Sequence, residues 1–439
     1  MTARIDYRVA PGGRLTGQAR VPGDKSISHR SVMLGSIAEG TTRVTGFLEA
    51  EDALATLAAF RQMGVTIEGP EQGRLSIQGV GLHGLRASAE PLYLGNSGTS
   101  MRLLCGLLAG QSFDSILTGD RSLSKRPMRR VTEPLRQMGA RIETTAEGTA
   151  PIHIHGGQDL HGIDYTMPVA SAQVKSCLLL AGLYAEGETC VTEPAPTRDH
   201  TERMLQGFGY EVRRKESRVC LRGGGRLSAT SLDVPADISS AAFFLVGASI
   251  APGSELLLEH VGINPTRTGV IDILRLMGAK IDVLNSRVVG GEPVADLKVL
   301  SSSLKGIHIP DRLVPLAIDE FPVLFVAAAC AEGETVLTGA AELRVKESDR
   351  IQVMADGLKI LGVEARPTPD GIVIQGGRIG GGRVVSHGDH RIAMAFAIAA
   401  LRSDDTIEIE DCANVNTSFP GFAELAQSLG LQVEVLTDE

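Results

Sequence analysis

The sequence predicts an α/β fold in which six similar units are divided between two domains. The chain has 439 residues, which is long for a single domain, and two domains of roughly 200 residues each are the usual outcome. A glycine recurs six times between a helix-like and a strand-like segment, and an apolar helix-like segment precedes each glycine. A hydrophobic content of 43% is sufficient for both domains to bury a core.

The recurring glycine marks the end of an amphipathic helix. A glycine just after a helix can adopt the left-handed conformation that ends many helices, and the alternation that follows it is typical of a strand. Successive glycines are 68 to 84 residues apart, a spacing that indicates a structural repeat. The six are Gly64, Gly139, Gly209, Gly278, Gly362 and Gly430.

The apolar segments upstream of these glycines are expected to be buried helices. The longest, such as 241–252 and 392–401, are about half the length of a membrane span. Each is followed by a turn and a strand. Such alternation with short turns indicates α/β packing, with the apolar helices inside and sheets around them.

Six units divide naturally into two domains of three. We expect the first domain at residues 24–235 and the second at residues 1–22 plus 238–439, with a hinge at residues 21–24 and 233–238. Both crossings contain a Val-Pro pair, which disfavours helix continuation.

Two glycine-rich segments, 222–226 and 376–383, could be mistaken for phosphate-binding loops. Neither is followed by the Lys-Ser/Thr pair and the helix that such a loop requires. We expect hairpin turns at both places.

Charge and cysteine content limit the possible functions. The formal net charge of −9 argues against a general nucleic-acid or membrane-surface binder, so any anion site must be a local group of Lys and Arg. Residues 1–13 lack the apolar segment of a secretory signal. The six cysteines are widely spaced, without a C-x-x-C pair, and we expect reduced thiols in a cytoplasmic protein.

Polar and charged residues gather at the expected starts of the six apolar helices. In the first, Lys25 and Ser26 follow a Pro-Gly bend and Arg30 lies about one turn later. The first turn of a helix has unpaired N–H groups and the positive end of its dipole, which suits a phosphate or carboxylate. Any one of these residues could be an N-cap or a solvated charge, but six coincidences at one register favour a site. The other starts carry Asn96, Ser97, Gly98; Ser171, Ala172, Gln173, Lys175; Asp237, Ser239, Ser240; Asp319, Glu320; and Asp389, His390, Arg391.

Metal ligation is not expected. His153 and His155 share one strand face, and His387 and His390 lie near a helix start, but neither pair has a complete ligand set at zinc spacing.

These segments together resemble the 5-enolpyruvylshikimate-3-phosphate (EPSP) synthase family, whose members transfer the enolpyruvyl group of phosphoenolpyruvate to the 5-hydroxyl of shikimate 3-phosphate. The resemblance runs from about Val21 to Phe422. It implies a transferase of chorismate and aromatic amino acid biosynthesis. It also implies a two-domain inside-out α/β fold with six βαβαββ units, three per domain, and an active site in the interdomain cleft. The matching segments are GDKSISHR, LGNSGTSMR, KRPM, SAQVKS, NPTRTG, ELRVKESDR, GDHRIAM and TSFP.

The resemblance also implies site residues. Shikimate 3-phosphate is expected on Lys25, Ser26, Arg30, Ser171, Ala172, Gln173, Arg198, Asp319 and Lys346. Phosphoenolpyruvate is expected on Lys25, Asn96, Gly98, Arg126, Gln173, Arg350 and Arg391.

The implied chemistry is an addition followed by an elimination. The substrate hydroxyl attacks C2 of phosphoenolpyruvate while C3 takes a proton, and the tetrahedral ketal then loses phosphate and a C3 proton. By the resemblance, Glu347 protonates C3, Asp319 accepts the hydroxyl proton and Lys25 assists. Arginines suit bidentate contact with the phosphate and carboxylate. No metal or organic cofactor is expected.

Within the family the chain is similar to the class II branch, often tolerant of the inhibitor glyphosate, and it departs from the family pattern twice. Thr417 replaces a Lys that many class I members place on phosphoenolpyruvate. Gly98 stands where tolerant class II members carry Ala, so we expect glyphosate to inhibit.

Two other functions fit the sequence less well. A UDP-N-acetylglucosamine enolpyruvyl transferase would share the fold and donor, but that family typically has a loop Cys where this chain has KRPM. A six-unit DNA clamp would line its ring with basic helices, whereas here the basic residues lie at helix starts among carboxylates. We therefore expect a monomeric enzyme without nucleic-acid or membrane partners.

Overall fold

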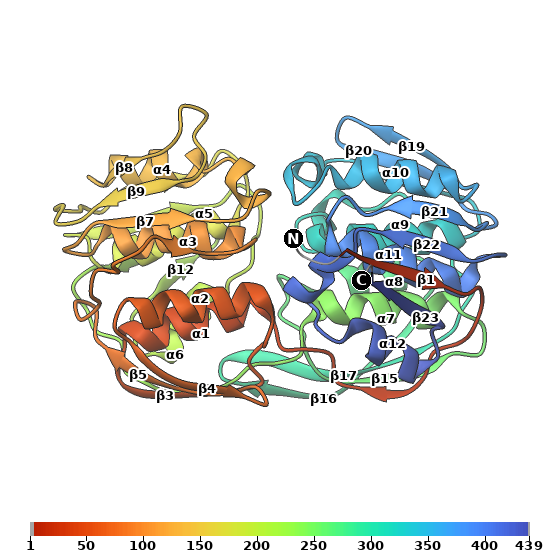
Figure 1. Cartoon of the computed structure of the whole chain (residues 1–439), viewed down its shortest axis with the longest axis horizontal. Coiled ribbons are helices and arrows are strands. Elements are labelled where there is room, and N and C mark those ends of the chain that lie inside the picture. The colour runs from red at the N-terminus through yellow and green to blue at the C-terminus, as the bar shows by residue number, and fades with distance from the viewer. Residues whose placement is uncertain (1–3, 438–439) are drawn as a thin grey trace. The chain divides into compact units, whose positions relative to one another are not determined.

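The computed structural model describes residues 4–437. They form two compact units (Figure 1). The first unit contains Gly23–Val234 together with Val289–Glu292. The second unit contains the chain through Pro22, Pro235–Val288 and the chain from Pro293 onward.

The first unit consists of three helix pairs and three four-stranded sheets. Its helices are α1 (Lys25–Ile37), α2 (Glu51–Gln62), α3 (Gly98–Ala109), α4 (Arg129–Gln137), α5 (Ala172–Gly182) and α6 (His200–Gly207). Its sheets have the orders β14-β3-β5-β4, β6-β7-β9-β8 and β10-β11-β13-β12. The strands are β3 (Glu39–Thr45), β4 (Thr66–Glu71), β5 (Arg74–Val80), β6 (Leu92–Tyr93), β7 (Ser115–Thr118), β8 (Arg141–Glu143), β9 (Ile152–His155), β10 (Asp164–Thr166), β11 (Glu188–Thr192), β12 (Arg213–Lys215), β13 (Arg218–Arg222) and β14 (Ser231–Asp233).

The second unit repeats this plan. Its helices are α7 (Ile238–Ile250), α8 (Gly269–Leu276), α9 (Phe321–Cys330), α10 (Arg350–Ile360), α11 (His390–Ala399) and α12 (Phe422–Leu429). Its sheets have the orders β16-β17-β15-β2, β18-β20-β19 and β21-β22-β1-β23. The strands are β1 (Ile5–Val9), β2 (Thr16–Ala19), β15 (Glu255–Gly262), β16 (Lys280–Val289), β17 (Glu292–Leu300), β18 (Glu334–Leu337), β19 (Glu364–Thr368), β20 (Gly371–Gln375), β21 (Gly382–Val385), β22 (Ile407–Glu410) and β23 (Val433–Thr437).

Strand pairing confirms the repeat. In the first unit, each sheet contains a parallel pair followed by an antiparallel pair. β6 is parallel to β7, and β7 is antiparallel to β9. The strands β10, β11 and β13 pair in this way, and so do β14, β3 and β5. In the second unit, β2 is parallel to β15 and β21 to β22. The third sheet has three strands. At the place of the fourth strand, His308 forms an isolated parallel bridge with Val336 of β18.

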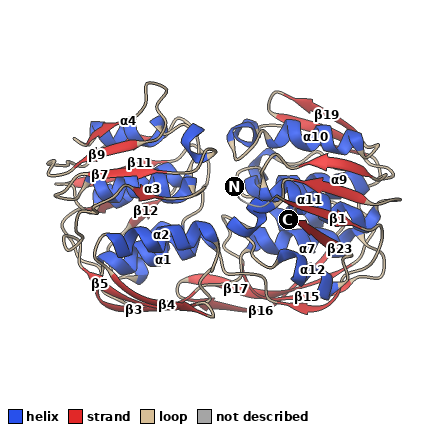
Figure 2. Ribbon diagram, in the orientation of Figure 1, coloured by secondary structure: helices blue, strands red, loops and turns tan. Residues whose placement is uncertain are grey.

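Apolar helices form the interior of each unit, as predicted. Every residue of α7 and α11 is buried, and so are all of α9 but Cys330. A helix that is apolar all round has no face for water and must be enclosed. These three helices pack on one another, as α3 does on α5. In each unit the strands lie around the helices (Figure 2).

The six repeat glycines lie where they were predicted, just after α2, α4, α6, α8, α10 and α12. Their φ angles are all positive, from 79° at Gly209 to 123° at Gly430. A side chain is strained in this conformation, so glycine is the residue that ends these helices.

The glycine-rich segments are not hairpin turns, and that prediction is wrong. Residues 222–226 lead from β13 to β14, and residues 376–383 lead from β20 into β21. In both cases the flanking strands belong to different sheets. The glycines end the preceding strand, but the sheet that the following strand joins depends on packing between segments that are distant in sequence. Neither segment leads directly into a helix, so neither is a phosphate loop.

The expectation of six reduced thiols is also wrong for two of them. Cys190 on β11 and Cys220 on β13 form a disulfide, while Cys105, Cys177, Cys330 and Cys412 are free. Cys190 and Cys220 are 30 residues apart in the sequence, so their pairing cannot be read from a local motif. It depends on the register of β11 with β13. No helix in the described part of the chain combines the length and apolar character needed to cross a membrane.

Candidate active site

The start of α1 presents Lys25 beside an acidic partner. Asp24 caps the helix by accepting a hydrogen bond from the Ile27 backbone N–H at 2.8 Å. Lys25 Nζ lies 3.2 Å from Asp52 Oδ2, and the lysine side chain is 18% exposed. Since the helix dipole and the ammonium carry the same sign of charge, this partly exposed position favours an anion.

Ser26, Arg30 and Arg198, three of the predicted ligands, lie together. The Arg30 Nη1 donates to the Ser26 carbonyl at 2.9 Å, and Arg198 Nη1 donates to Ser26 Oγ at 3.4 Å. Arg30 also donates to Thr201 Oγ1 at 2.7 Å and to Ser176 Oγ at 2.9 Å. Arg30 is buried, so it also fixes the first turn of α1 against α5 and α6.

At the start of α3, Asn96 and Gly98 both lie against Arg126. The Asn96 Oδ1 accepts from Arg126 Nη2 at 2.8 Å, and its Nδ2 donates to Asp120 Oδ2 at 2.7 Å. A Cβ placed on Gly98 would lie 2.8 Å from Arg126 Nη1. Glycine at position 98 therefore lets this guanidinium approach the backbone of the helix start.

The start of α5 is tied to α3. Ser171 caps α5 with its side chain and Ala172 is the first helical residue. Gln173 Nε2 donates to Thr99 Oγ1 at 3.0 Å, and Gln173 Oε1 accepts a hydrogen bond from Arg102 Nη1. Arg102 was given no role from the sequence, although it is the last residue of the LGNSGTSMR segment.

A buried histidine joins α1 to α3. Burial, followed by the charges of Lys25 and Arg30, lowers the pKa of His29 to about 3. The ring is therefore neutral at physiological pH and adds no charge to the cluster. Its Nδ1 lies 2.8 Å from Thr56 Oγ1, and its Nε2 lies 3.4 Å from the Oγ of Ser97, the N-cap of α3.

Lys175, counted among the helix-start residues, lies in the interior instead. Its Nζ is 3.0 Å from both Glu193 and Glu202, and its side chain is fully buried. Arg214 completes the group at 2.6 Å from Glu193. Burial alone would raise the pKa of Glu193, but Lys175 and neighbouring hydrogen bonds outweigh it and lower that pKa. This network supports the fold beneath the cluster.

In the second unit, the buried side chain of Arg350 contacts both Glu347, the predicted acid, and Asp319, the predicted base. Arg350 begins α10, and its Nη2 lies 2.7 Å from Glu347 Oε2 and its Nη1 3.4 Å from Asp319 Oδ1. Lys346 Nζ is also 3.4 Å from Asp319 Oδ1. The structure therefore brings Asp319, Lys346, Glu347 and Arg350 into one cluster.

Asp389 anchors this arginine. It accepts from Arg350 Nε at 2.9 Å and caps α11 by accepting from the Arg391 backbone N–H at 3.0 Å. Burial opposes the charge of Arg350, but Asp389, Glu347 and Asp319 outweigh it and raise the arginine pKa. Sequence reasoning placed Asp389 at a helix start and missed its contact with Arg350, which lies 39 positions earlier.

Two motif residues have structural partners. Thr417 is buried and donates to the Asn414 carbonyl at 2.7 Å, so the residue that replaces a lysine stabilises its own short helix. Arg267, in the NPTR segment, donates to Asp237 Oδ1 at 2.9 Å and to Ser239 Oγ at 2.8 Å. It therefore holds the start of α7.

Comparison with known proteins gives consistent matches over nearly the whole chain. A family model described as EPSP synthase (3-phosphoshikimate 1-carboxyvinyltransferase) matches residues 9–425. A 3-phosphoshikimate 1-carboxyvinyltransferase of Methylococcus capsulatus is 73% identical over 98% of this chain and 99% of its own length. That of Alkalilimnicola ehrlichii is 73% identical over 97% of this chain and 96% of its own.

Two solved structures are also similar to this chain. The EPSP synthase of Acinetobacter baumannii superposes with a TM-score of 0.89 at 62% identity, covering 99% of this chain and 100% of that one. The enolpyruvyl transferase NikO of Streptomyces tendae superposes with a TM-score of 0.81 at 16% identity, covering 100% of both chains. This second likeness concerns the fold alone.

Proposed function

Because the chain belongs to the EPSP synthase family, we propose that the cluster around Lys25 and the cluster around Arg350 act on one pair of substrates. The chain is a transferase of the shikimate pathway that moves the enolpyruvyl group of phosphoenolpyruvate to shikimate 3-phosphate. The two compact units then correspond to functional domains, with the hinge at residues 21–24 and 233–238.

The observation that supports this assignment best is the pairing of two carboxylates with one guanidinium. Glu347 and Asp319 lie 2.7 and 3.4 Å from nitrogens of Arg350. We assign Asp319 as the base that accepts the substrate hydroxyl proton and Glu347 as the acid that protonates C3. C3 is weakly basic, so its acid must be held close, and a fixed cation provides that orientation.

Shikimate 3-phosphate is proposed to bind hydroxyl, guanidinium and helix N–H groups. Ser26 and Arg198 already share a hydrogen bond, and Arg30 orients Ser26 through its carbonyl. Hydroxyl, guanidinium and helix N–H groups together suit a phosphate. The full proposed set is Lys25, Ser26, Arg30, Ser171, Ala172, Gln173, Arg198, Asp319 and Lys346.

Phosphoenolpyruvate carries a phosphate and a carboxylate, and its proposed ligands are correspondingly rich in arginine. Arg126 lies against Asn96 and Gly98, and Gln173 is held by Arg102. Planar guanidinium groups bind carboxylate and phosphate in bidentate fashion. The proposed set is Lys25, Asn96, Gly98, Arg126, Gln173, Arg350 and Arg391.

The same proposal covers partners and location. Both substrates are phosphorylated anions that cross a membrane poorly, so we place the enzyme in the cytoplasm. We expect it to be monomeric, with no nucleic-acid or membrane partner, and to need neither metal nor organic cofactor.

The direct test of the activity is phosphate release. We expect release only when phosphoenolpyruvate and shikimate 3-phosphate are both present. Release with UDP-N-acetylglucosamine in place of shikimate 3-phosphate, and none with the proposed pair, would instead assign the chain to the other enolpyruvyl transferase activity.

Position 98 allows a prediction about glyphosate, which resembles phosphoenolpyruvate in charge but is longer. We expect glyphosate to inhibit the wild type, and Gly98→Ala to raise its inhibition constant more than the KM for phosphoenolpyruvate. The alanine Cβ would lie 2.8 Å from Arg126 Nη1, so the end of this flexible side chain must shift. One methyl group typically discriminates by about 10- to 200-fold.

Steady-state inhibition by glyphosate against varied phosphoenolpyruvate measures both constants. Gly207→Ala is a matched control, because an added Cβ at position 207 meets no atom within 4 Å. A wild type that is already insensitive, with no change in Gly98→Ala, would place the cause of tolerance elsewhere in the chain.

A further inference from the structure

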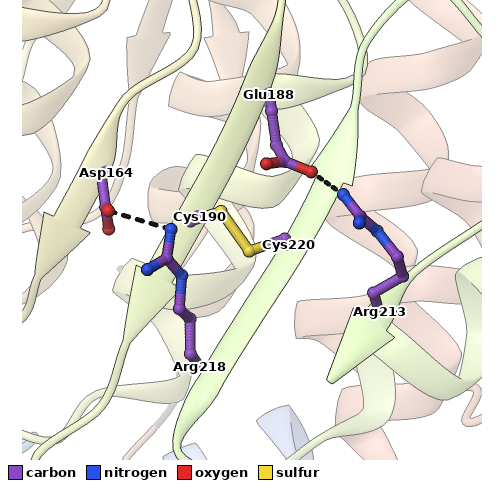
Figure 3. Close-up of a disulfide and its surroundings, with 6 residues drawn as sticks. All are labelled: Asp164, Glu188, Cys190, Arg213, Arg218 and Cys220. Carbon is purple, nitrogen blue, oxygen red and sulfur yellow. Dashed lines mark ion pairs between the residues drawn. A yellow bond between two sulfur atoms is a disulfide. The ribbon is translucent and has the colours of Figure 1, made fainter. Parts of the chain in front are cut away.

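The disulfide lies on the outer face of its sheet. Cys190 and Cys220 are directly opposite each other on antiparallel β11 and β13, with their Cα atoms 4.1 Å apart. Alternate residues such as Val191 and Val219 are fully buried on the core side. Because side chains alternate between the faces of a strand, the cysteines point the other way. Figure 3 shows the sulfur–sulfur bond among charged side chains.

Charged residues surround the sulfur atoms on this outer face. Arg213 of β12 is directly opposite Cys220 and is paired with Glu188, and Arg218 lies 2.9 Å from Asp164 (Figure 3). All four side chains are at least 40% exposed. The guanidinium groups are paired with carboxylates, and these exposed side chains leave Cys220 partly exposed, so a small thiol or disulfide can reach it.

The remaining thiols have the opposite environment. Burial raises the pKa of Cys105 and Cys330 to about 12, and it also raises the pKa of Cys177 and Cys412. These four are protonated at neutral pH, and three of them are buried, while Cys330 is partly exposed. Among the described cysteines, Cys190 and Cys220 are the two that form a disulfide, so a disulfide can form and break at this pair.

We propose that Cys190 and Cys220 form a reversible thiol–disulfide exchange site that takes dithiols as reductants and low-molecular-weight disulfides as oxidants. Exchange begins at Cys220, since it is partly exposed and Cys190 is only 3% exposed. This site is separate from the two clusters that act on the substrates.

The exchange is balanced in atoms and electrons. One thiolate of the dithiol attacks Cys220 Sγ, the bond between the two protein sulfurs breaks, and Cys190 leaves as a thiolate that takes up a proton. The second thiol of the reductant then displaces Cys220 and closes the reductant into a disulfide. Two electrons and two protons pass to the protein. A small disulfide reverses the reaction and leaves as two thiols.

Metal binding at this place is less favourable. One ligand atom each from Glu188, Cys190 and Cys220 lie within 4.8 Å of one another, a spacing that could hold an ion. However, the Glu188 carboxylate already forms an ion pair with Arg213. The guanidinium groups of Arg213 and Arg218 would also repel a cation.

The test follows thiols in the full-length protein. The protein is equilibrated with mixtures of dithiothreitol and its oxidised form, or of glutathione and glutathione disulfide. It is then acid-quenched, alkylated after unfolding and analysed by mass spectrometry. We expect Cys190 and Cys220 to lose alkylation together as the mixture becomes oxidising, while the other four stay alkylated. In the native reduced protein, Cys220 should alkylate at least about ten times faster than the other four.

Variants separate this proposal from a general effect of reductant. Reduction of the wild type should lower its melting temperature by about 5 to 10 °C, because the cross-link closing the intervening segment is lost. Cys220→Ser should show no reductant-dependent shift, and Cys330→Ser, a matched thiol outside the pair, should behave like the wild type. Six alkylated cysteines at every ratio, or equal shifts in all three proteins, would overturn the proposal. Stoichiometric zinc retained by the reduced wild type and lost in Cys220→Ser would overturn it in favour of a metal site.

Discussion

Glu347→Gln and Asp319→Asn should each slow turnover by about 100-fold or more while shikimate 3-phosphate still binds. A positioned acid or base typically contributes a factor of this size. Both changes keep the shape of the side chain and a hydrogen-bond acceptor toward Arg350, which holds the two carboxylates. Phosphate release measures turnover, and calorimetric titration with shikimate 3-phosphate measures binding.

A carboxylate on α10, the helix that begins at Arg350, provides the control. Asp356 is exposed on α10 and accepts a hydrogen bond from Gln352, so Asp356→Asn should leave turnover within about twofold of wild type. If Glu347→Gln or Asp319→Asn matched this control, the role assigned to that residue would be wrong.

Lys175→Met should destabilise the first unit by about 3 to 5 kcal/mol. The change removes the cation that lies 3.0 Å from both Glu193 and Glu202. Arg214 then faces two carboxylates, and one of their charges is uncompensated. Breaking a buried ion pair by removing one partner has a cost of about this size. Urea unfolding monitored by hydrogen exchange in α5 measures the change.

Two further variants test the cause. Lys215→Met removes an exposed lysine of the same unit and should change stability by less than about 0.5 kcal/mol. Adding Glu202→Gln to Lys175→Met should recover part of the loss, because it removes one uncompensated charge. A Lys175→Met protein as stable as Lys215→Met would show that the network contributes little to folding.

Much of the fold could be predicted because its signals are local. Each repeat glycine follows a helix within two residues, so its left-handed conformation can be inferred from the adjacent pattern. The starts of α1, α3, α5, α7, α9 and α11 were likewise indicated by short segments. Local capping chemistry and hydrophobic periodicity determine both features.

What could not be predicted depends on contacts between distant segments. The disulfide depends on the register of β11 with β13. The path of each glycine-rich segment depends on which sheet the next strand joins. The same limit applies to the site. The Arg102 contact with Gln173 and the Asp389 contact with Arg350 join residues 71 and 39 positions apart. Lys175 shared a helix start with ligand candidates, yet the helix turns its side chain inward.

The central claim is that Glu347 delivers a proton to C3 and that addition precedes elimination. The measurement that tests it most directly is mass spectrometry of product formed in D2O. Addition would place one deuteron on C3 and make it a methyl group, and loss of one C3 hydrogen would leave deuterium in part of the product. We expect deuterium at C3 of the enolpyruvyl group, formed about 100-fold more slowly by Glu347→Gln. Product released with phosphate but without deuterium at C3, or deuterium incorporated at the wild-type rate by Glu347→Gln, would contradict the account.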